Sequence, residues 1–400
     1  MKLLSTMLRK LTNTSIMPLI SFQMTSFILP WLITIWYTHQ QDLQAVGNFT
    51  FALAIIAPIS LLLASPSRNF LLTQTAAFND AFASRLLLLI LGLIVVAIIG
   101  SYYHHLLLFC ALFLFKSAEL LYDLPISSAM AHHQIKKLWQ LNFSKWAVII
   151  VLAATGYFSE TLEWLFVLGF VIFVMITWLT REKSSKKLQL PRCFAMLIKA
   201  MPLSISTLIF AIHFNIPRYV IASFEQPELL AIFSISSFLV MAAVVLANIF
   251  VQAKLPLLKT LYVQHAKQFH WHLLTILAVI MVIFIIIQIA QWPFFSDVFW
   301  QLHNNVQRQQ AQFSLVFQQT LLMAWGPLLF SASNYILMLT GQHITLVILT
   351  SINLLITALL CFFAFQFFGF FALLMAFNLG CLLHLISVWL AFTYHWKNNG

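Results

Sequence analysis

One short segment, "KSAELLYD" from Lys116 to Asp123, places three charges inside an apolar run. Lys116, Glu119 and Asp123 fall within an arc of about 60°, because a helix advances about 100° per residue. A charge in the middle of a membrane span costs about 2.5–3.5 kcal/mol on insertion scales, so charges that face lipid are disfavoured. We therefore expect all three side chains to face the interior of a helix bundle, with Lys116 paired to Glu119 and Asp123 near both.

Two carboxylates for one ammonium group leave one acidic group in excess. Such a group can bind a proton or a cation such as Na⁺, which makes Glu119 and Asp123 candidates for an ion-coupling site. A structural role is equally compatible with the same residues, because a paired cluster can lock a bundle together. The sequence leaves both interpretations open.

The composition around this segment is that of a membrane protein. Of 400 residues, 62% are hydrophobic and 8% are charged, whereas a soluble domain carries about 25% charged residues. A spanning helix needs about 20 apolar residues, and the alternation typical of barrel strands is absent. We therefore predict an all-α polytopic membrane protein with about twelve transmembrane helices. The predicted spans are 16–37, 45–65, 86–101, 106–131, 146–158, 164–180, 195–216, 229–252, 272–290, 313–339, 343–366 and 370–394.

The net charge of +11 is explained by the orientation of the chain and not by a nucleic-acid partner. If the N-terminus lies inside, all Lys and Arg residues except Lys116, Arg218 and Arg308 lie in inside segments or at inside helix ends. This is the positive-inside pattern of multi-pass proteins. It predicts that both termini lie in the cytoplasm.

The two halves of the chain share several marks. "MPL" begins at Met17 and again at Met201, and Pro30 and Pro217 follow at similar depths. Six helices separate the copies, so both enter the membrane in the same direction, which predicts a parallel repeat about an axis along the membrane normal. We expect a six-helix lobe over 1–180, a cytoplasmic loop over 181–194 and a second six-helix lobe over 195–400, the lobes being related by a pseudo-two-fold axis.

Prolines lie inside the first helix of each predicted lobe. Proline removes a backbone donor and bends a helix, and a membrane helix tolerates it where protein or water satisfies the freed carbonyl. We therefore predict hinges beside a central cavity, although proline is also common in membrane helices without such a role. The candidate hinge residues are Pro18, Pro30, Pro202 and Pro217.

Several segments together resemble the Wzx-type polysaccharide flippases of the multidrug/oligosaccharidyl-lipid/polysaccharide (MOP) exporter superfamily. They are "AIIAPISLLLASPSRNFLLTQ" from Ala54, "KSAELLYD" from Lys116, "NIPRYVIASFEQPELLAIFS" from Asn215 and, more loosely, "LTGQHITL" from Leu339. The resemblance implies a MATE-like fold and transport of an undecaprenyl-diphosphate-linked oligosaccharide from the inner to the outer leaflet of the bacterial inner membrane. It also implies contacts with membrane lipids, and a glycan polymerase or chain-length regulator as a candidate partner.

A diphosphate cargo needs cationic partners, and guanidinium groups match phosphate oxygens. The candidates for a cationic substrate pathway are Arg68, Lys116, Arg218 and Lys254. Arg68 and Lys254 also fit the positive-inside rule alone. Arg218 breaks that rule, and its alternative role is an ion pair with Glu225 or Glu228.

Two rival functions remain. A multidrug or cation antiporter of the same superfamily prefers an acidic cavity, against which Lys116 and Arg218 argue. A membrane-bound glycan polymerase or ligase usually needs a sizeable outer segment, but the longest outer connection, 291–312, holds one acid, Asp297, and one arginine, Arg308. Neither a nucleotide motif nor metal-ligand spacing is evident, so we expect no enzyme activity, no metal and no cofactor beyond a coupling ion, H⁺ or Na⁺.

Overall fold

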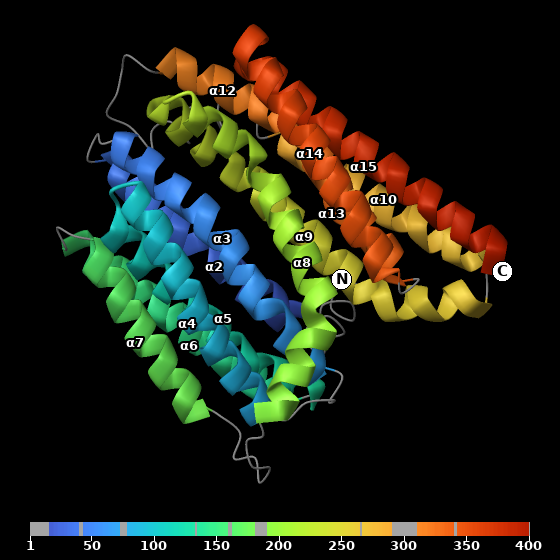
Figure 1. Ribbon diagram of the computed structural model, residues 1–400, viewed down its shortest axis with the longest axis horizontal. Coiled ribbons are helices and arrows are strands. Elements are labelled where there is room, and N and C mark those ends of the chain that lie inside the picture. The colour runs from blue at the N-terminus through green and yellow to red at the C-terminus, as the bar shows by residue number, and fades with distance from the viewer. Residues whose placement is uncertain are drawn as a thin grey trace, which may run out of the picture. The chain divides into compact units, whose positions relative to one another are not determined.

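The computed structural model describes residues 16–39, 43–72, 78–132, 134–158, 162–180, 190–264, 266–289, 310–339 and 342–399. All regular elements in these ranges are α-helices (Figure 1). The helices are α2 (Ile16–His39), α3 (Leu43–Leu72), α4 (Phe78–Tyr102), α5 (Leu106–Ala131), α6 (Ile135–Phe158), α7 (Leu162–Thr180), α8 (Leu190–Ser223), α9 (Pro227–Gln264), α10 (Ala266–Ile289), α12 (Gln310–Leu322), α13 (Trp325–Leu339), α14 (His343–Phe368) and α15 (Phe370–Asn399).

Each predicted span coincides with one helix, except the tenth. The structure divides the span predicted over 313–339 into α12 and α13. Pro327 has no N–H to bond the carbonyl of Met323, and it occupies the first turn of α13, where that loss is tolerated. The span predicted over 146–158 is longer than expected, because α6 begins at Ile135.

Ten of the described helical segments are long and apolar enough to cross a membrane, counting α12 and α13 as one. The described apolar part of α2, Met24–Trp36, is shorter. Helix α5 has 26 residues, which span about 39 Å at 1.5 Å per residue, but its three charges lower its hydropathy. The chain is therefore a multi-pass membrane protein with the predicted all-α architecture.

The contacts divide the chain into two compact units. The N-terminal unit comprises Met1–Ile33 and Ala52–Ala211, and the C-terminal unit comprises Thr34–Phe51 and Ile212–Gly400. The boundaries of these units fall inside α2, α3 and α8. The predicted lobes over 1–180 and 195–400 stay a prediction, and residues 181–189 of the predicted loop lie outside the described residues.

Helix α5 is the centre of the N-terminal unit, where it packs against α4, α6 and α7. Its large side chains, among them Phe109, Phe113 and Tyr122, are fully buried. By contrast, α4 and α7 expose apolar side chains such as Ile98 and Leu179. Charged residues on α5 consequently face protein, whereas the outer helices present a surface suited to lipid.

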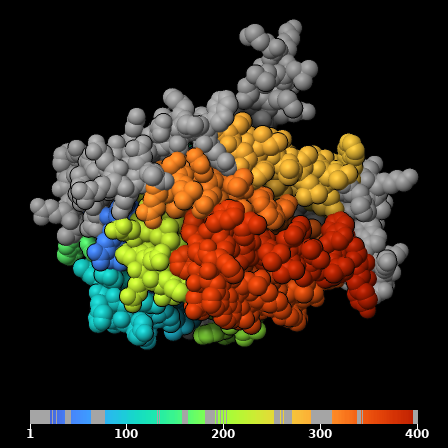
Figure 2. Space-filling model, turned by 90° about the horizontal axis from the view of Figure 1, so that it is seen from above, coloured from blue at the N-terminus to red at the C-terminus, as the bar shows by residue number. Residues whose placement is uncertain are grey.

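In the C-terminal unit, α9 packs against α10, α12 and α13, and α15 packs against α13 and α14. The α14–α15 hairpin turns at Gly369, whose φ of 79° is a left-handed conformation that favours glycine. Figure 2 shows α14 and α15, in red, side by side on one face of the molecule. Apolar residues such as Leu355 and Leu390 are exposed there, as expected for a lipid-facing surface.

Close packing of the α14–α15 hairpin depends on Gly380. A Cβ atom at this position would overlap the Oγ1, Cγ2 and Cβ atoms of Thr357 on α14. We expect Gly380→Ala to destabilise the protein by about 1–3 kcal/mol, the usual cost of overpacking. Gly156→Ala is the control, because its Cβ would meet only the flexible end of Leu165. Thermal unfolding in detergent measures both, and equal midpoints for the two variants would contradict the prediction.

The four candidate hinge prolines occupy different helical positions. Pro30 lies inside α2, and Pro202 and Pro217 lie inside α8. Pro18 is the third described residue of α2. Hinge motion at all four positions stays a prediction.

Candidate functional site

The predicted pair on α5 is present in the N-terminal unit. Lys116 Nζ lies 3.0 Å from Glu119 Oε2, three residues along the same helix. Lys145, on α6, approaches the other oxygen of Glu119, with 2.7 Å between Nζ and Oε1. Asp123 lies 3.8 Å from the guanidinium of Arg85 on α4, and Arg85 also donates to the carbonyl of Leu120. We call these five side chains the N-terminal charge cluster.

The prediction of a carboxylate in excess is wrong. The cluster contains three cations, Arg85, Lys116 and Lys145, and two carboxylates, Glu119 and Asp123. An excess follows only if the charges of α5 are taken alone, whereas two of the cations, Arg85 and Lys145, come from the neighbouring helices α4 and α6. Each carboxylate of the cluster therefore already has a cationic partner.

Two lysines of the N-terminal charge cluster also contact α2 in the turns that precede Pro30. Pro30 has no N–H for the carbonyl of Ser26, four residues earlier, and Lys116 Nζ lies 3.3 Å from that oxygen. Lys145 donates to the Ser26 hydroxyl at 2.7 Å and to the Phe22 carbonyl at 3.2 Å, and its Nζ lies 3.8 Å from the centre of the Phe22 ring. A carbonyl freed by proline is thus satisfied by a neighbouring helix, as membrane interiors require.

Sequence reasoning missed Arg85 and Lys145 because it counted both as cytoplasmic charges. Their side chains are buried, and Lys145 is 0% exposed. A signal was available for Lys145. Leu138, Leu141, Lys145 and Leu152 follow helical spacing on one buried stripe, so extending the span upstream of 146 would have placed this lysine in the bundle.

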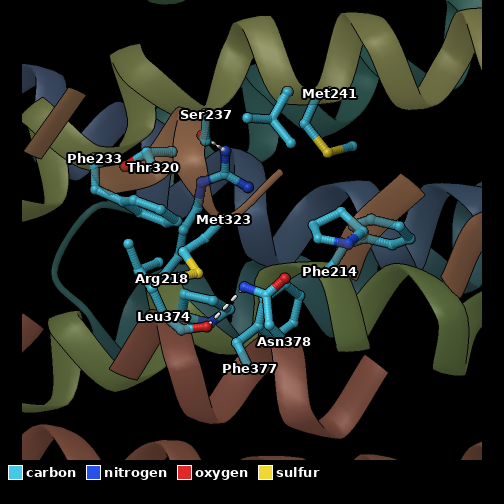
Figure 3. Close-up of a pocket in the computed structure, with 13 residues that line it drawn as sticks. Phe214, Arg218, Phe233, Ser237, Met241, Thr320, Met323, Leu374, Phe377 and Asn378 are labelled. Carbon is cyan, nitrogen blue, oxygen red and sulfur yellow. Dashed lines mark hydrogen bonds between the residues drawn. The ribbon is translucent and has the colours of Figure 1, made fainter. Parts of the chain in front are cut away.

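A pocket lies in the C-terminal unit around Arg218. Its walls come from α8, α9, α12, α13 and α15 and include Phe214, Phe233, Met323 and Phe377. Figure 3 shows Arg218 reaching toward Ser237, with Phe233 and Met323 close to it. Except for Arg218, the polar lining consists of neutral side chains, Ser237, Thr320 and Asn378.

Neutral hydrogen-bond acceptors hold the Arg218 guanidinium in place. Asn215 Oδ1, three residues earlier on α8, accepts from Nη1 at 2.7 Å. Ser237 and Ser234, three residues apart on α9, accept from Nη2 at 2.5 Å and from Nε at 3.4 Å. The guanidinium carbon lies 5.8 Å from the centre of the Phe233 ring. The sequence contained part of this pattern, because spacings of three place Asn215 and Arg218, and Ser234 and Ser237, on shared helix faces.

Arg218 keeps binding capacity after these contacts. A guanidinium has five N–H donors, and the three hydrogen bonds leave two donors without a partner among the described residues. No carboxylate within the described ranges forms an ion pair with Arg218. The alternative in which Glu225 or Glu228 neutralises it is therefore not what the structure contains.

The remaining cationic candidates are placed only by their helices. Arg68 lies on α3 and Lys254 on α9, and their side chains fall outside the described ones. Lys116 belongs to the N-terminal charge cluster, so the structure assigns Lys116 and Arg218 to different units. The predicted roles of Arg68 and Lys254 stay predictions.

Comparisons with known proteins bear on the fold. No protein-family model matches the sequence, and no curated protein matches it either. The structure does match solved structures. An inward-facing multidrug resistance MATE family transporter of the MOP superfamily has a TM-score of 0.74 over 95% of this chain and 98% of its own, with 11% identity. This chain has the fold of the MOP superfamily.

Two further matches have related descriptions. The lipid II flippase MurJ, in an inward closed conformation, has a TM-score of 0.69 and 12% identity, over 95% of this chain and 88% of its own. A MOP superfamily transporter from Pyrococcus furiosus, described as having a binding pocket of reverse polarity, has a TM-score of 0.67 and 12% identity, over 96% and 94%. The TM-scores show a MATE/MOP-like fold, and identities of 11–12% carry no information on the cargo.

Proposed function

We propose that the protein is a flippase that moves an undecaprenyl-diphosphate-linked oligosaccharide from the inner to the outer leaflet of the bacterial inner membrane by alternating access. The cargo would be the repeat unit of an O-antigen, a capsule or another exported polysaccharide. The observation that carries this proposal is Arg218, a guanidinium in a pocket whose described lining contains no carboxylate and which keeps two N–H donors that the described residues do not use. The unused N–H donors of a guanidinium match the oxygens of a phosphate group.

The N-terminal charge cluster also bears on the charge of the substrate that we propose, which is negative. Its five side chains include three cations, Arg85, Lys116 and Lys145, so both carboxylates already have cationic partners and neither is left over for a cationic substrate. One MOP-fold protein, MurJ, is described as a lipid II flippase, so this fold is compatible with transport of a lipid-linked substrate. We propose cytoplasmic termini, as the distribution of Lys and Arg predicts.

A multidrug antiporter is the second candidate, because a protein described as a multidrug resistance MATE transporter shares this fold with a TM-score of 0.74. An organic cation in the Arg218 pocket would meet an unneutralised positive charge at short range. Two like charges about 4 Å apart repel by about 4 kcal/mol at an effective dielectric constant near 20. The pocket therefore favours an anionic substrate over a cationic one.

A binding experiment separates the two candidates. The purified full-length chain is titrated with farnesyl diphosphate, a polyprenyl diphosphate without sugar, with uncharged farnesol and with the organic cation tetraphenylphosphonium. We expect binding of farnesyl diphosphate, with farnesol weaker by about tenfold or more, since a charged hydrogen bond contributes about 1.5–3 kcal/mol. Binding of tetraphenylphosphonium without binding of farnesyl diphosphate would instead favour the antiporter.

A further inference from the structure

Two buried histidines pack against one phenylalanine in the C-terminal unit. His213 on α8 and His384 on α15 are both 0% exposed. The His213 ring is stacked on Phe330 of α13, with 4.1 Å between ring centres, and the His384 ring is tilted against Phe330 at 4.5 Å. His213, Phe330 and His384 therefore connect α8, α13 and α15. None of the three is among the side chains that contact the Arg218 guanidinium.

Each histidine has one ring nitrogen without a partner. His384 Nε2 lies 2.9 Å from Asn334 Oδ1, and His213 Nε2 lies 3.9 Å from Cys381 Sγ. Nδ1 of His213 and Nδ1 of His384 are buried and make no hydrogen bond within the described residues. An unsatisfied buried polar atom costs about 1–3 kcal/mol, so two such atoms at one place call for a reason.

Pro217 leaves the backbone carbonyl of His213 available as a further acceptor. It has no N–H to donate to the carbonyl of His213, four residues earlier on α8. His213 consequently combines a buried ring nitrogen without a partner among the described residues with a backbone oxygen that its proline cannot satisfy. The backbone oxygen favours a bound positive charge, and so does Nδ1 in the tautomer in which Nε2 carries the proton.

The His213 ring is coupled by contact to the Arg218 pocket. Phe377, which lines the pocket, lies 5.6 Å from the His213 ring. Phe214, the neighbour of His213, also lines the pocket and meets Phe330 edge-on at 5.5 Å. Two pocket walls are therefore also walls of the histidine site, and the Arg218 pocket and the histidines belong to one packed group of side chains.

The ionisable groups around His213 are few. On α15 they are Cys381 and His384. Arg218 and Tyr219 follow on the same helix as His213, five and six residues further along. Among the described residues, α13 contributes Phe330 and Asn334, and no carboxylate forms an ion pair with either histidine. Without an anion bound in the Arg218 pocket, a protonated His213 would therefore be a buried charge without a counter-ion, which is strongly disfavoured.

We propose that His213 binds a proton when an anionic substrate occupies the Arg218 pocket. This inference rests on the proposed function, because the bound anion supplies the negative charge that the histidine site lacks. The face of Phe330 adds a cation–π contribution to the protonated imidazole. Because coupling is reciprocal, the anion tightens proton binding and the proton tightens anion binding by the same factor. The proximity of His384 to the same ring limits uptake to one proton, since a second positive charge would be repelled.

The test measures proton uptake during binding of farnesyl diphosphate to the full-length chain, by calorimetry in buffers of different ionisation enthalpy. We expect the parent to take up about one proton more than His213→Gln over the pH range in which histidine titrates, about 5–8. His105→Gln is the matched control, because His105 is exposed before α5 in the other unit, and it should behave like the parent. Equal proton uptake by the parent and His213→Gln would overturn the inference.

A second measurement follows the pH dependence of anion binding in the parent, and Arg218→Ala shows whether that binding uses the Arg218 pocket. Farnesyl sulfate carries one charge that does not titrate in this pH range, so its affinity reports only on the protein. We expect its affinity to rise as pH falls, by up to about tenfold per pH unit for one linked proton. Affinity independent of pH, with binding still lost in Arg218→Ala, would contradict the proton site and leave the proposed function intact. Absence of binding, or binding unaffected by Arg218→Ala, would contradict both.

Discussion

Arg218→Ala is expected to abolish glycan export while the amount of protein in the membrane stays at the parental level. The variant removes the two unused N–H donors that the substrate would occupy, and charge-assisted hydrogen bonds contribute about 1.5–3 kcal/mol each. Loss of both corresponds to a decrease of about a hundredfold or more in binding. Export is measured in bacteria without their own flippase, in which the parent chain restores surface glycan, and is divided by the amount of membrane-inserted protein.

Two further variants show what Arg218 does. Arg218→Lys keeps the charge but loses the paired donors, so we expect export between those of the parent and the alanine variant. Glu225→Gln should export at the parental rate, because no ion pair joins Glu225 to Arg218 in the described structure. If Arg218→Ala exports normally, Arg218 has only a structural role and the proposed function loses its main support.

Glu119→Ala is expected to cause the largest loss of folded protein among single changes in the N-terminal charge cluster. Glu119 is the carboxylate that both Lys116 and Lys145 contact, and Lys145 is fully buried. Its removal leaves two neighbouring ammonium groups without a counter-ion, at a cost of about 3–5 kcal/mol for a broken buried pair. Size-exclusion chromatography and thermal unfolding of detergent extracts measure the folded fraction.

Lys116→Met is the matched control for Glu119→Ala. Glu119 keeps Lys145 and Asp123 keeps Arg85 in this variant, so every carboxylate of the cluster retains a cation. We therefore expect a milder loss, in contrast to the severe effect that the charges of α5 alone would predict. If Lys116→Met unfolds the protein as strongly as Glu119→Ala does, the assignment of Lys145 as the principal partner of Glu119 is wrong.

Lys116 and Arg218 differ in the contacts that they make. Lys116 contacts the Ser26 carbonyl on α2, which Pro30 cannot bond, whereas Arg218 lies beside Pro217 on α8 and lines a pocket. Lys116 thus already binds Glu119 and the Ser26 carbonyl. Arg218 keeps two N–H donors that no described residue accepts from. We infer that Arg218, more than Lys116, makes direct contact with the substrate.

The sequence by itself determined the membrane class and nearly all helices. Bilayer thickness and the need to satisfy every backbone hydrogen bond act on windows of about 20 residues, which are local in sequence. The span predicted over 106–131 therefore coincides with α5, Leu106–Ala131. The same local rule missed the break before Trp325 and began α6 too late, because Lys136, Lys137 and Lys145 interrupt its apolar run.

Only the tertiary structure decided which charges neutralise one another. The Lys116–Glu119 pair was predictable because both residues lie on one helix face, three positions apart. Arg85 and Lys145 come from α4 and α6, and sequence spacing carries no information on contacts between helices. For the same reason, the environment of Arg218 required the structure. Its neighbours Ser234 and Ser237 lie on α9, and whether a buried cation is neutralised or available to a ligand depends on side chains that packing alone brings together.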